Sequence, residues 1–389
     1  MNITASKICV IGAGIAGLSV ARALALRGAK VTVLEQADAI REVGAGLQIS
    51  PNGYVVLKAL GLGRALAEQS VMADAVSLRD YQKGEVLRLD LTRQVPRHYH
   101  FVHRADLIET LAEGARAAGV KVRLLQKIES VTQGAPAQVT TASGATFEAD
   151  LVIGADGLHS KMRPVLNETA KPFFTRQVAW RAVVPVEQKA ERVARLFMAP
   201  HRHLVVYPLR DGKFLNVVAI QERAAWVEEG WNVKDDPDSL RAAFGDFGAE
   251  AQDVLRRIDE VHIWGLFRHP VAKTWVGKGM AMLGDAAHPT LPFLAQGANL
   301  ALEDAWVLAD TIEELGINPP ALDAYQAKRR PRVCRAIKAA NANAWKYHLS
   351  FGPIRWAAQM ALRTGGRLAP QSMLQQFDWL YEHDVTRHS

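Results

Sequence analysis

Three glycines near the start of the chain, Gly12, Gly14 and Gly17, have the spacing of a phosphate-binding turn. They lie at the end of the apolar run ICVIGAGIAG, which leads into LSVARALALRGAK. In G-x-G-x-x-G between a strand and a helix, the first glycine allows the tight turn, the second admits a pyrophosphate and the third permits close helix packing. The N–H groups that open the helix also attract phosphate. We therefore expect a dinucleotide at this turn, which includes Ala16.

Glu35 ends the next apolar run, VTVLEQ, and is followed by Gln36. A carboxylate at the end of the second strand can accept hydrogen bonds from both hydroxyl groups of an adenosine ribose, and it would repel a 2′-phosphate. FAD and NAD both carry an unphosphorylated adenosine ribose, so this motif alone does not choose between them.

Two later segments place carboxylates at the ends of expected strands. DLVIGADGLHSKMR, residues 150–163, breaks an apolar strand at a glycine and presents Asp156. MAMLGDAAHPTLPFLAQGANLALEDA, residues 280–305, ends a strand at Gly284 and Asp285 and continues through a proline-containing loop into a helix. A carboxylate such as Asp285 is well placed to accept a hydrogen bond from a polyol. The helix that starts near Gln296 can point its positive end at a bound ring.

Together, the three motifs resemble those of the flavoprotein aromatic hydroxylases, the single-component FAD monooxygenases that include the para-hydroxybenzoate, salicylate and 3-hydroxybenzoate hydroxylases. VGAGLQISPNG, VHRADL and GDAAHPTLPFLAQGANLALEDA are most similar to the salicylate, 3-hydroxybenzoate and 6-hydroxynicotinate hydroxylase branch, and the resemblance covers essentially the whole chain. It implies an oxidoreductase in which reduced FAD reacts with O2 to form a C4a-hydroperoxide that hydroxylates a small aromatic acid or phenol. The resemblance also implies that NADH or NADPH binds transiently at the domain cleft, and the absence of a second glycine triplet before a helix fits this.

The same resemblance assigns residues to the FAD site. It implies that Asp285 holds a ribityl hydroxyl, that Arg104 contacts the side of the flavin, and that Asp156 belongs to a segment associated with both FAD and the nicotinamide cofactor. The helix end near Gln296 would favour the negative charge of reduced flavin. The expected cofactor-binding residues are Gly12, Gly14, Ala16, Gly17, Glu35, Gln36, Gly46, Leu47, Arg104, Asp156, Gly284, Asp285, Pro292, Gly297, Ala298 and Asn299.

The segment HLVVYPL supplies the candidate catalytic residues. Alternation along a strand places His203 and Tyr207 on the same face as Val205. A histidine in that position could orient or deprotonate a hydroxyl group near neutral pH. The pair is also similar to active-site positions of the 6-hydroxynicotinate branch. The alternative interpretation is an exposed sheet face with a histidine at its rim.

Four further residues are expected to bind substrate, namely Gln48, Arg181, Pro292 and Phe293. Arg181 could pair with a carboxylate or with the nicotinamide pyrophosphate, and a structural salt bridge is the alternative. Pro292 stiffens its loop, while Phe293 would make an apolar contact over the ring. Some relatives carry His at the position of Gln48 and a polar residue at that of Phe293, so the identity of the hydroxylated ring stays open.

Composition and charge indicate the general class of protein and the kind of ligand it binds. The chain of 389 residues is 49% hydrophobic and 22% charged, as is ordinary for a globular protein. Its net charge of +7 is spread along the sequence, which favours attraction of anionic cofactors and substrates over nucleic-acid binding. No long apolar run or leader-like segment is present, so we expect a cytoplasmic monomer or homodimer without membrane contact.

Metal binding is not expected. The two cysteines have neither a disulfide framework nor a metal-ligand spacing. His98, His100 and His103 form H-x-H-x-x-H, but we interpret them as surface histidines that do not share one face of their strand. No carboxylate or cysteine completes a ligand set.

These elements predict an α/β fold, in which a Rossmann-like FAD-binding domain with a parallel sheet is interleaved with a substrate domain built on an antiparallel sheet. The FAD-binding domain is expected to take residues 1–72, 101–171 and 271–330, and the substrate domain residues 73–100 and 172–270. Residues 331–389 would form a C-terminal helical tail broken near Gly352–Pro353 and Gly365–Gly366. The pair Asp211–Gly212 predicts a hairpin, and GLQISPNG is interpreted as a loop.

Three other functions remain open at this stage. A hydroxylase or epoxidase of a lipophilic polyketide, quinone or isoprenoid would be favoured by a membrane-adhering helix in the apolar stretch 345–362. A non-catalytic flavin-binding protein, such as a redox-responsive regulator, would hold FAD without turnover. A simple flavin oxidase or dehydrogenase shares the glycine triplet but not the two later motifs.

Overall fold

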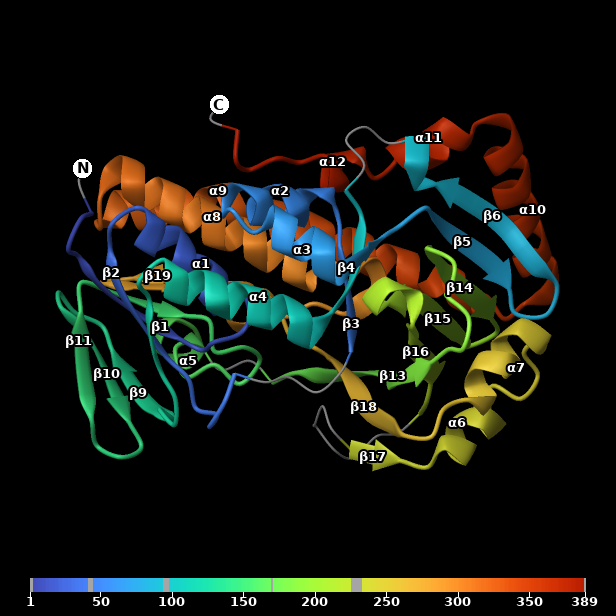
Figure 1. Cartoon of the computed structure of the whole chain (residues 1–389), viewed down its shortest axis with the longest axis horizontal. Coiled ribbons are helices and arrows are strands. Elements are labelled where there is room, and N and C mark those ends of the chain that lie inside the picture. Colours follow the sequence, from blue (N-terminus) through green and yellow to red (C-terminus); the bar gives the residue numbers. More distant parts are fainter. Residues whose placement is uncertain (1–2, 41–44, 94–97, 169–170, 225–232, 388–389) are drawn as a thin grey trace.

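Two large sheets organise the polypeptide, one mainly parallel and one mainly antiparallel (Figure 1). The structure is a computed structural model that describes residues 3–40, 45–93, 98–168, 171–224 and 233–387. The mixed architecture confirms the predicted fold class. The domain boundaries given above stay predictions.

The six-stranded sheet is built on continuous apolar runs. β1 (Lys7–Ile11) and β12 (Leu151–Gly154) are almost wholly buried, which is typical of parallel strands covered by helices on both faces. All neighbouring pairs are parallel except β19–β20. The strand order is β19 (Val276–Gly277), β20 (Met280–Met282), β12, β1, β2 (Lys30–Leu34) and β8 (Lys121–Arg123).

Long helices cover this sheet. Helix α1 (Ile15–Leu26) contacts both α4 (Arg104–Ala117) and α8 (Gly297–Leu315), and α8 packs against α9 (Pro319–Ala344). The ranges 103–119 and 296–315 suggested by the sequence for two of these helices are therefore confirmed to within two residues at each end. A three-stranded antiparallel sheet contacts β1 and β12 and comprises β11 (Thr146–Ala149), β10 (Ala137–Thr141) and β9 (Ile128–Thr132).

The eight-stranded sheet occupies the other end of the molecule (Figure 1). Adjacent strands in this sheet are antiparallel, except for the parallel pair β14–β5. Short helices α6 (Pro237–Ala243) and α7 (Ala249–Arg256) contribute to the apolar core on one face. The strand order is β17 (Val233–Asp235), β18 (Val261–Arg268), β13 (Phe173–Pro185), β16 (Phe214–Glu222), β15 (Arg202–Leu209), β14 (Val193–Ala199), β5 (Ala75–Asp80) and β6 (Gly84–Asp90).

The hairpin predicted from Asp211–Gly212 is confirmed. β15 and β16 pair along their whole length, and a short turn joins them. The turn places Asp211 at φ 58° and Gly212 at φ 80°, in the left-handed region that glycine and aspartate tolerate best.

The interpretation of GLQISPNG as a loop is wrong. Gly46–Ile49 forms β3, which pairs with β7 (His100–His103), and β7 pairs in turn with β4 (Ser70–Met72). The helix α2 (Pro51–Ala59) follows directly and is succeeded by α3 (Gly63–Gln69). Backbone pairing with a distant strand therefore overrides the weak strand preference of glycine and glutamine.

The interpretation of the three histidines as surface residues is wrong for His100, although the three do not all share one face, because His103 is three residues further along β7. His98 and His100 lie on the same side of the chain, where both rings stack on Tyr54 at centroid distances of 4.0 and 5.1 Å. His100 is buried and hydrogen-bonds Ser70. Residues two apart in an extended segment point the same way, so the pair forms an aromatic stack. Within the described residues, no cluster of histidine, cysteine and carboxylate groups could hold a metal ion.

The C-terminal segment is helical, as expected, but it breaks at only one of the two expected points. After a short turn at residues 345–348, α10 begins at Gly352 and continues to Leu368, through Gly365 and Gly366. A Cβ on Gly366 would collide with Leu87 of β6, so close packing explains a helical glycine. α11 (Pro370–Gln375) and α12 (Asp378–Tyr381) follow. Helix α9 runs through residue 331, where we placed the start of the tail.

In the part of the chain that the structure describes, no helix is both long and apolar enough to span a membrane.

Candidate active site

A cavity lies where the carboxyl ends of β1 and β12 meet one face of the eight-stranded sheet. Ligands of open parallel sheets bind at this edge because loops and helix N-termini converge there. The structure places thirteen of the residues selected from the sequence in the cavity lining: Gly14, Ala16, Gly46, Leu47, Gln48, Arg104, Arg181, His203, Tyr207, Asp285, Pro292, Gly297 and Ala298.

Eight selected residues lie outside that lining, although most belong to the same turns: Gly12, Gly17, Glu35, Gln36, Asp156, Gly284, Phe293 and Asn299. Asp156 turns away to accept a hydrogen bond from the backbone of Lys161 at 2.7 Å. Burial raises the pKa of Asp156, although hydrogen bonds from its own loop oppose the effect. Asn299 ties α8 to β3 by donating to the carbonyl of Gln48 at 3.0 Å and accepting from the N–H of Ser50 at 3.1 Å.

The first glycine turn has the shape that a pyrophosphate requires. Gly12 has φ 99°, and a Cβ there would come within 2.5 Å of the carbonyl oxygen of Ala155. A Cβ on Gly17 would collide with the carbonyl oxygen of Gly12, so this glycine allows helix and turn to touch. Gly14 differs from both, because a Cβ there would meet no atom within 4 Å and would project into open space. Of the three glycines, Gly14 alone therefore leaves open space where a side chain would stand.

The helix that follows this turn is not capped by a side chain. Gly14 is the N-cap of α1, and the first turn of the helix contains no acidic residue. Glu35 instead accepts backbone N–H bonds from Ala13 at 2.7 Å and from Ala37 at 2.9 Å. These bonds place its carboxylate next to the glycine turn, at the end of β2. An uncapped helix start beside a carboxylate suits a phosphate with an attached ribose.

A second helix N-terminus reaches the cavity at α8. Its N-cap residue, Gln296, makes no capping bond; its amide donates to the hydroxyl of Ser50 at 3.0 Å and accepts from Asn52 at 3.1 Å. The N–H groups of the first turn are thus left for whatever occupies the cavity. The positive end of this helix favours a ligand that carries negative charge.

Asp285 and Arg104 add charged groups to the same wall. Asp285 follows β20 and is exposed to the cavity rather than to the outer surface. The surrounding protein raises the pKa of Asp285 by removing solvent, and the charges of His288 and Arg104 oppose this rise. Burial lowers the pKa of Arg104, while Asp285 acts in the opposite direction. A carboxylate that faces a cavity in this way can accept a hydrogen bond from a ligand hydroxyl.

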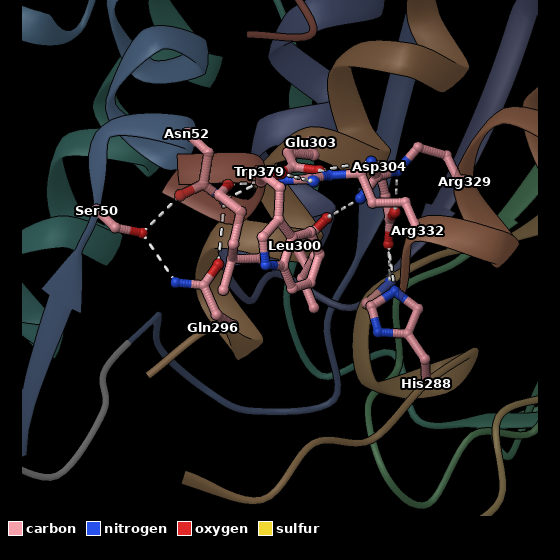
Figure 2. Close-up of polar contacts among 12 residues, drawn as sticks. Ser50, Asn52, His288, Gln296, Leu300, Glu303, Asp304, Arg329, Arg332 and Trp379 are labelled. Atoms are coloured by element: carbon pink, nitrogen blue, oxygen red, sulfur yellow. Dashed lines mark hydrogen bonds and ion pairs between the residues drawn. The ribbon is translucent and has the colours of Figure 1, made fainter. Parts of the chain in front are cut away.

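A buried ionic network holds this wall in place, and Figure 2 shows it running from α8 to α9. Arg329 contacts Glu303 at 2.5 Å and Asp304 at 2.7 Å, and Arg332 contacts Glu303 at 2.7 Å. His288 also contacts Asp304, at 2.5 Å. Burial alone would raise the pKa of Asp304, but His288 and Arg329 outweigh it and lower the pKa to about 2.

This network also fixes the turn that carries Asp285. The backbone N–H of Gly284 donates to Asp304 at 3.1 Å, and His288 lies at the other end of the same turn. None of the four charged residues of this network was among the predicted site residues. The adjacent acids Glu303 and Asp304, inside the otherwise apolar stretch ANLALEDAWVLA, were the available signal, because buried carboxylates require paired cations.

One face of the eight-stranded sheet forms the opposite wall. On β15, His203, Val205 and Tyr207 face the cavity, while Leu204 and Val206 pack into the apolar core behind it. The predicted alternation is therefore confirmed. The strand register places Arg181 opposite Val218, and Val218 opposite Val205, so Arg181 projects from the same face.

Burial controls the charge states on this wall. It lowers the pKa of His203 well below its usual value, with a smaller contribution from His348, so His203 is neutral near pH 7. It raises the pKa of Tyr207, against the opposing charge of Arg181. Burial lowers the pKa of Arg181 to about 10, which leaves it charged near neutrality. The guanidinium lies 4.5 Å from the ring centroid of Trp264, in a cation–π contact.

Of the three other residues predicted to bind substrate, two line the cavity and one does not. Gln48 and Pro292 line the cavity, and the side-chain oxygen of Gln48 accepts a hydrogen bond from Tyr99 at 2.7 Å. Phe293 does not line it: this side chain is buried in an apolar cluster with Trp264 and has its ring centroid 6.2 Å from that of His203. Phe293 therefore supports the wall from behind.

Comparison with known proteins identifies the family to which the chain belongs. Residues 5–340 match the family model described as FAD binding domain. A 3-amino-4-hydroxybenzoate 2-monooxygenase of Streptomyces platensis is 35% identical over 394 residues, covering 96% of this chain and 95% of the relative. A 3-hydroxybenzoate 6-hydroxylase of Klebsiella oxytoca is 32% identical over 357 residues, covering 88% and 89%.

A solved structure extends the agreement to three dimensions. Klebsiella pneumoniae HpxO complexed with FAD and uric acid matches with a TM-score of 0.83 at 25% identity, covering 95% of this chain and 96% of that chain. The family match spans most of the chain, and the relatives are monooxygenases of hydroxylated aromatic acids. This protein is an FAD-binding enzyme that belongs to the single-component FAD-dependent aromatic hydroxylases.

Proposed function

We propose that the protein hydroxylates the ring of a small aromatic acid that already carries a hydroxyl group, with NADH or NADPH as the reductant and O2 as the oxygen source. The observation that carries this proposal is the arrangement of Arg181, Tyr207 and His203 on one cavity wall. The relatives act, by their names, on 3-amino-4-hydroxybenzoate and 3-hydroxybenzoate. Both compounds combine a carboxylate with a ring hydroxyl.

The residues of the other wall would hold FAD. The open space above Gly14 and the uncapped start of α1 would take the pyrophosphate, and Glu35 would accept hydrogen bonds from the adenosine ribose. Asp285 would accept one from the ribityl chain, and the start of α8 would face the ring. When bound, FAD supplies the electron transfer from NAD(P)H and the reaction with O2. The protein's own residues bind and orient the substrate.

Strand geometry suggests how the substrate lies. Arg181 stands in the same cross-strand row as Val205, and His203 and Tyr207 flank that row at two residues on either side. His203 and Tyr207 are therefore roughly 13 Å apart at the backbone, and both side chains line the cavity. We infer that the substrate carboxylate pairs with Arg181 near Tyr207 and that the ring hydroxyl points to His203.

Each side chain then has a defined task. The charged Arg181 anchors the carboxylate through a charge-assisted hydrogen bond, and the apolar Val205, Val218 and Ile220 exclude water from the ring. The neutral His203 accepts the proton of the ring hydroxyl, which makes the ring richer in electrons and more reactive toward an electrophilic oxygen. The nicotinamide cofactor would enter the same cleft transiently.

Anaerobic flavin reduction tests the proposal. The rate is measured by absorbance after mixing the FAD-loaded enzyme with NADH or NADPH, alone and with 3-amino-4-hydroxybenzoate, 3-hydroxybenzoate, salicylate or 6-hydroxynicotinate. We expect one ligand to accelerate reduction at least about tenfold and to be converted, once O2 is admitted, to a product heavier by one oxygen atom. Equal reduction rates with and without every ligand, and no oxygenated product, would refute it.

A further inference from the structure

His203 is the first member of a hydrogen-bonded chain that leads away from the cavity. Its Nδ1 lies 2.6 Å from Nε2 of His348. Nδ1 of His348 lies 2.8 Å from Oε1 of Glu222, and the other carboxylate oxygen of Glu222 lies 2.7 Å from Nδ1 of His201. The four groups come from β15, β16, the turn before β15 and the turn after α9.

The chain crosses from the interior to the surface. His203 is 2% exposed and lines the cavity, and His348 is 5% exposed. The side chain of Glu222 is 39% exposed and that of His201 is 61% exposed. A gradient of this kind connects a buried histidine of the cavity wall with groups that exchange protons with solvent.

Backbone hydrogen bonds fix the relative positions of His201, Glu222 and His348. The N–H of His201 donates to the carbonyl of His348 at 3.2 Å, and the N–H of Glu222 donates to the carbonyl of His201 at 2.9 Å. His201 adopts φ 59°, a left-handed conformation that is costly for a residue with a Cβ. The three groups therefore form a preorganised unit at this edge of the sheet.

The chain fixes which nitrogen of His203 is basic. Burial alone would raise the pKa of Glu222, but the hydrogen bonds from His201 and His348 outweigh it and lower the pKa, so Glu222 is a carboxylate near neutrality. A carboxylate only accepts, so His348 donates from Nδ1 and accepts at Nε2. His203 must then donate from Nδ1, and its Nε2 keeps a free lone pair for the cavity.

Other titratable groups near His203 do not offer this route. Tyr347 has its ring centroid 5.6 Å from that of His203, and burial raises its pKa to about 12. Tyr207 also has a raised pKa, mainly because of burial. Arg181, in the neighbouring row, keeps its proton. Among the residues described, His203, His348 and Glu222 form the titratable connection between this wall and solvent.

We propose that the series His203, His348 and Glu222, with His201 beside its outer end, is a proton path between the substrate hydroxyl and solvent, an inference that rests on the proposed function. The ring hydroxyl gives its proton to Nε2 of His203, and Nδ1 of His203 gives its own to Nε2 of His348. Nδ1 of His348 then protonates Glu222, which releases a proton to water beside His201. Each step breaks one N–H or O–H bond and forms another, with no change in oxidation state. In reverse, the path returns a proton to the product oxygen and restores the starting tautomers.

Ligand ionisation measured in a stopped-flow pH jump tests the path without turnover. The FAD-loaded enzyme is saturated with 3-amino-4-hydroxybenzoate at mildly acid pH and mixed with alkaline buffer, and ultraviolet absorbance reports conversion of the phenol to the phenolate. We expect His348→Gln and Glu222→Gln each to slow ionisation at least about tenfold, since general acid–base groups contribute on the order of 100-fold or more. Ligand affinity should change little, because neither side chain lines the cavity.

Two comparisons keep the result specific. Glu187→Gln removes the same charge from an exposed loop between β13 and β14, and it should ionise the ligand at the wild-type rate. Added imidazole should restore the rate of His348→Ala, which a merely structural defect would not allow. Wild-type rates in both His348→Gln and Glu222→Gln would overturn the path while leaving the hydroxylase proposal intact. Wild-type enzyme that binds no phenolic acid and oxygenates none would instead refute the proposed function, and the path with it.

Discussion

Arg181 places a permanent positive charge on a largely apolar wall, and its position under Trp264 limits how it can move. Its pKa of about 10 keeps it protonated throughout the physiological range. Among the residues that the structure describes, no carboxylate acts on the charge of Arg181. A buried cation without an anion is costly, so a carboxylate ligand would relieve this penalty. Substrate selection by charge should therefore depend mainly on this one residue.

Replacing Arg181 with Met should weaken binding of aromatic acids selectively. A hydrogen bond to a charged group is worth about 1.5–3 kcal/mol, so we expect KM to rise roughly 10- to 100-fold with a smaller change in kcat. Steady-state kinetics with 3-amino-4-hydroxybenzoate would measure this. The corresponding phenol without a carboxylate should bind equally to both enzymes. Arg64→Met, at a residue that is 92% exposed, serves as the control, and an unchanged KM in Arg181→Met would contradict the anchoring role.

Gly14 and Gly17 should respond differently to the same substitution. A Cβ at Gly14 points into open space at an ordinary φ of −79°, whereas a Cβ at Gly17 would strike the carbonyl of Gly12. Gly14→Ala should therefore leave the thermal stability of the apoprotein unchanged and weaken FAD binding at least about tenfold. Gly17→Ala should destabilise the fold itself, by about 1–3 kcal/mol or more. Thermal unfolding and fluorescence titration with FAD separate the two effects, and equal FAD affinity in Gly14→Ala and wild type would disprove this use of the turn.

At the scale of elements, the ionic network makes the cavity wall depend on the contact between α8 and α9. Asp304 forms hydrogen bonds with Arg329, His288 and the backbone N–H of Gly284. Glu303 similarly joins Arg329, Arg332 and Asn52. Helix packing thus fixes the turn that presents Asp285. Loss of a contact in the network should therefore alter the position of Asp285 in the cavity wall.

Asp304→Asn should reveal this dependence through the pH profile of stability. The folded pKa of about 2 lies below the usual value of 3.8, so the stabilisation is fully present above about pH 4 and is lost as pH falls toward 2. Asp304→Asn should lower the free energy of unfolding near neutral pH by about 3–5 kcal/mol and should flatten the profile in this acid window. Urea unfolding at several pH values measures both effects. Asp323→Asn, on the exposed face of α9, should change neither, and an unaltered acid profile in Asp304→Asn would exclude the network as its source.

Sequence patterns predicted those elements whose structure depends on residues close together in the chain. The glycine turn, the alternation on β15 and the hairpin at Asp211–Gly212 depend on neighbouring residues, and all three appear in the structure. Contacts between distant residues could not be read in the same way. His203 and His348 are 145 positions apart, and Gln48 in β3 meets Phe101 of β7 only through tertiary pairing. The assignment of Phe293 to the substrate surface depended on side-chain direction, which no spacing rule supplied.

At the scale of the whole molecule, the cavity is bounded by both large sheets. Gly14 and Asp285 belong to the parallel sheet and its loops, whereas Arg181 and His203 belong to the antiparallel sheet. A ligand that fills it touches segments that extend from Gly14 to Ala301 in the sequence. The net charge of +7 favours the approach of anionic ligands such as FAD and aromatic acids, and raised ionic strength should weaken that attraction.

Removal of FAD should therefore lower the stability of the entire molecule. At a free FAD concentration 100-fold above Kd, binding to the native state adds about 2.7 kcal/mol to the free energy of unfolding. We expect the apoprotein to unfold at a temperature several degrees lower and to recover on addition of FAD. Riboflavin, which lacks the pyrophosphate and the adenosine, should restore much less, because it has no group to contact the turn at Gly14 or the carboxylate of Glu35. Differential scanning calorimetry of the apoprotein with each compound measures this difference. Equal recovery with riboflavin would place the binding energy on the α8 side of the cavity and remove the glycine turn from the FAD site.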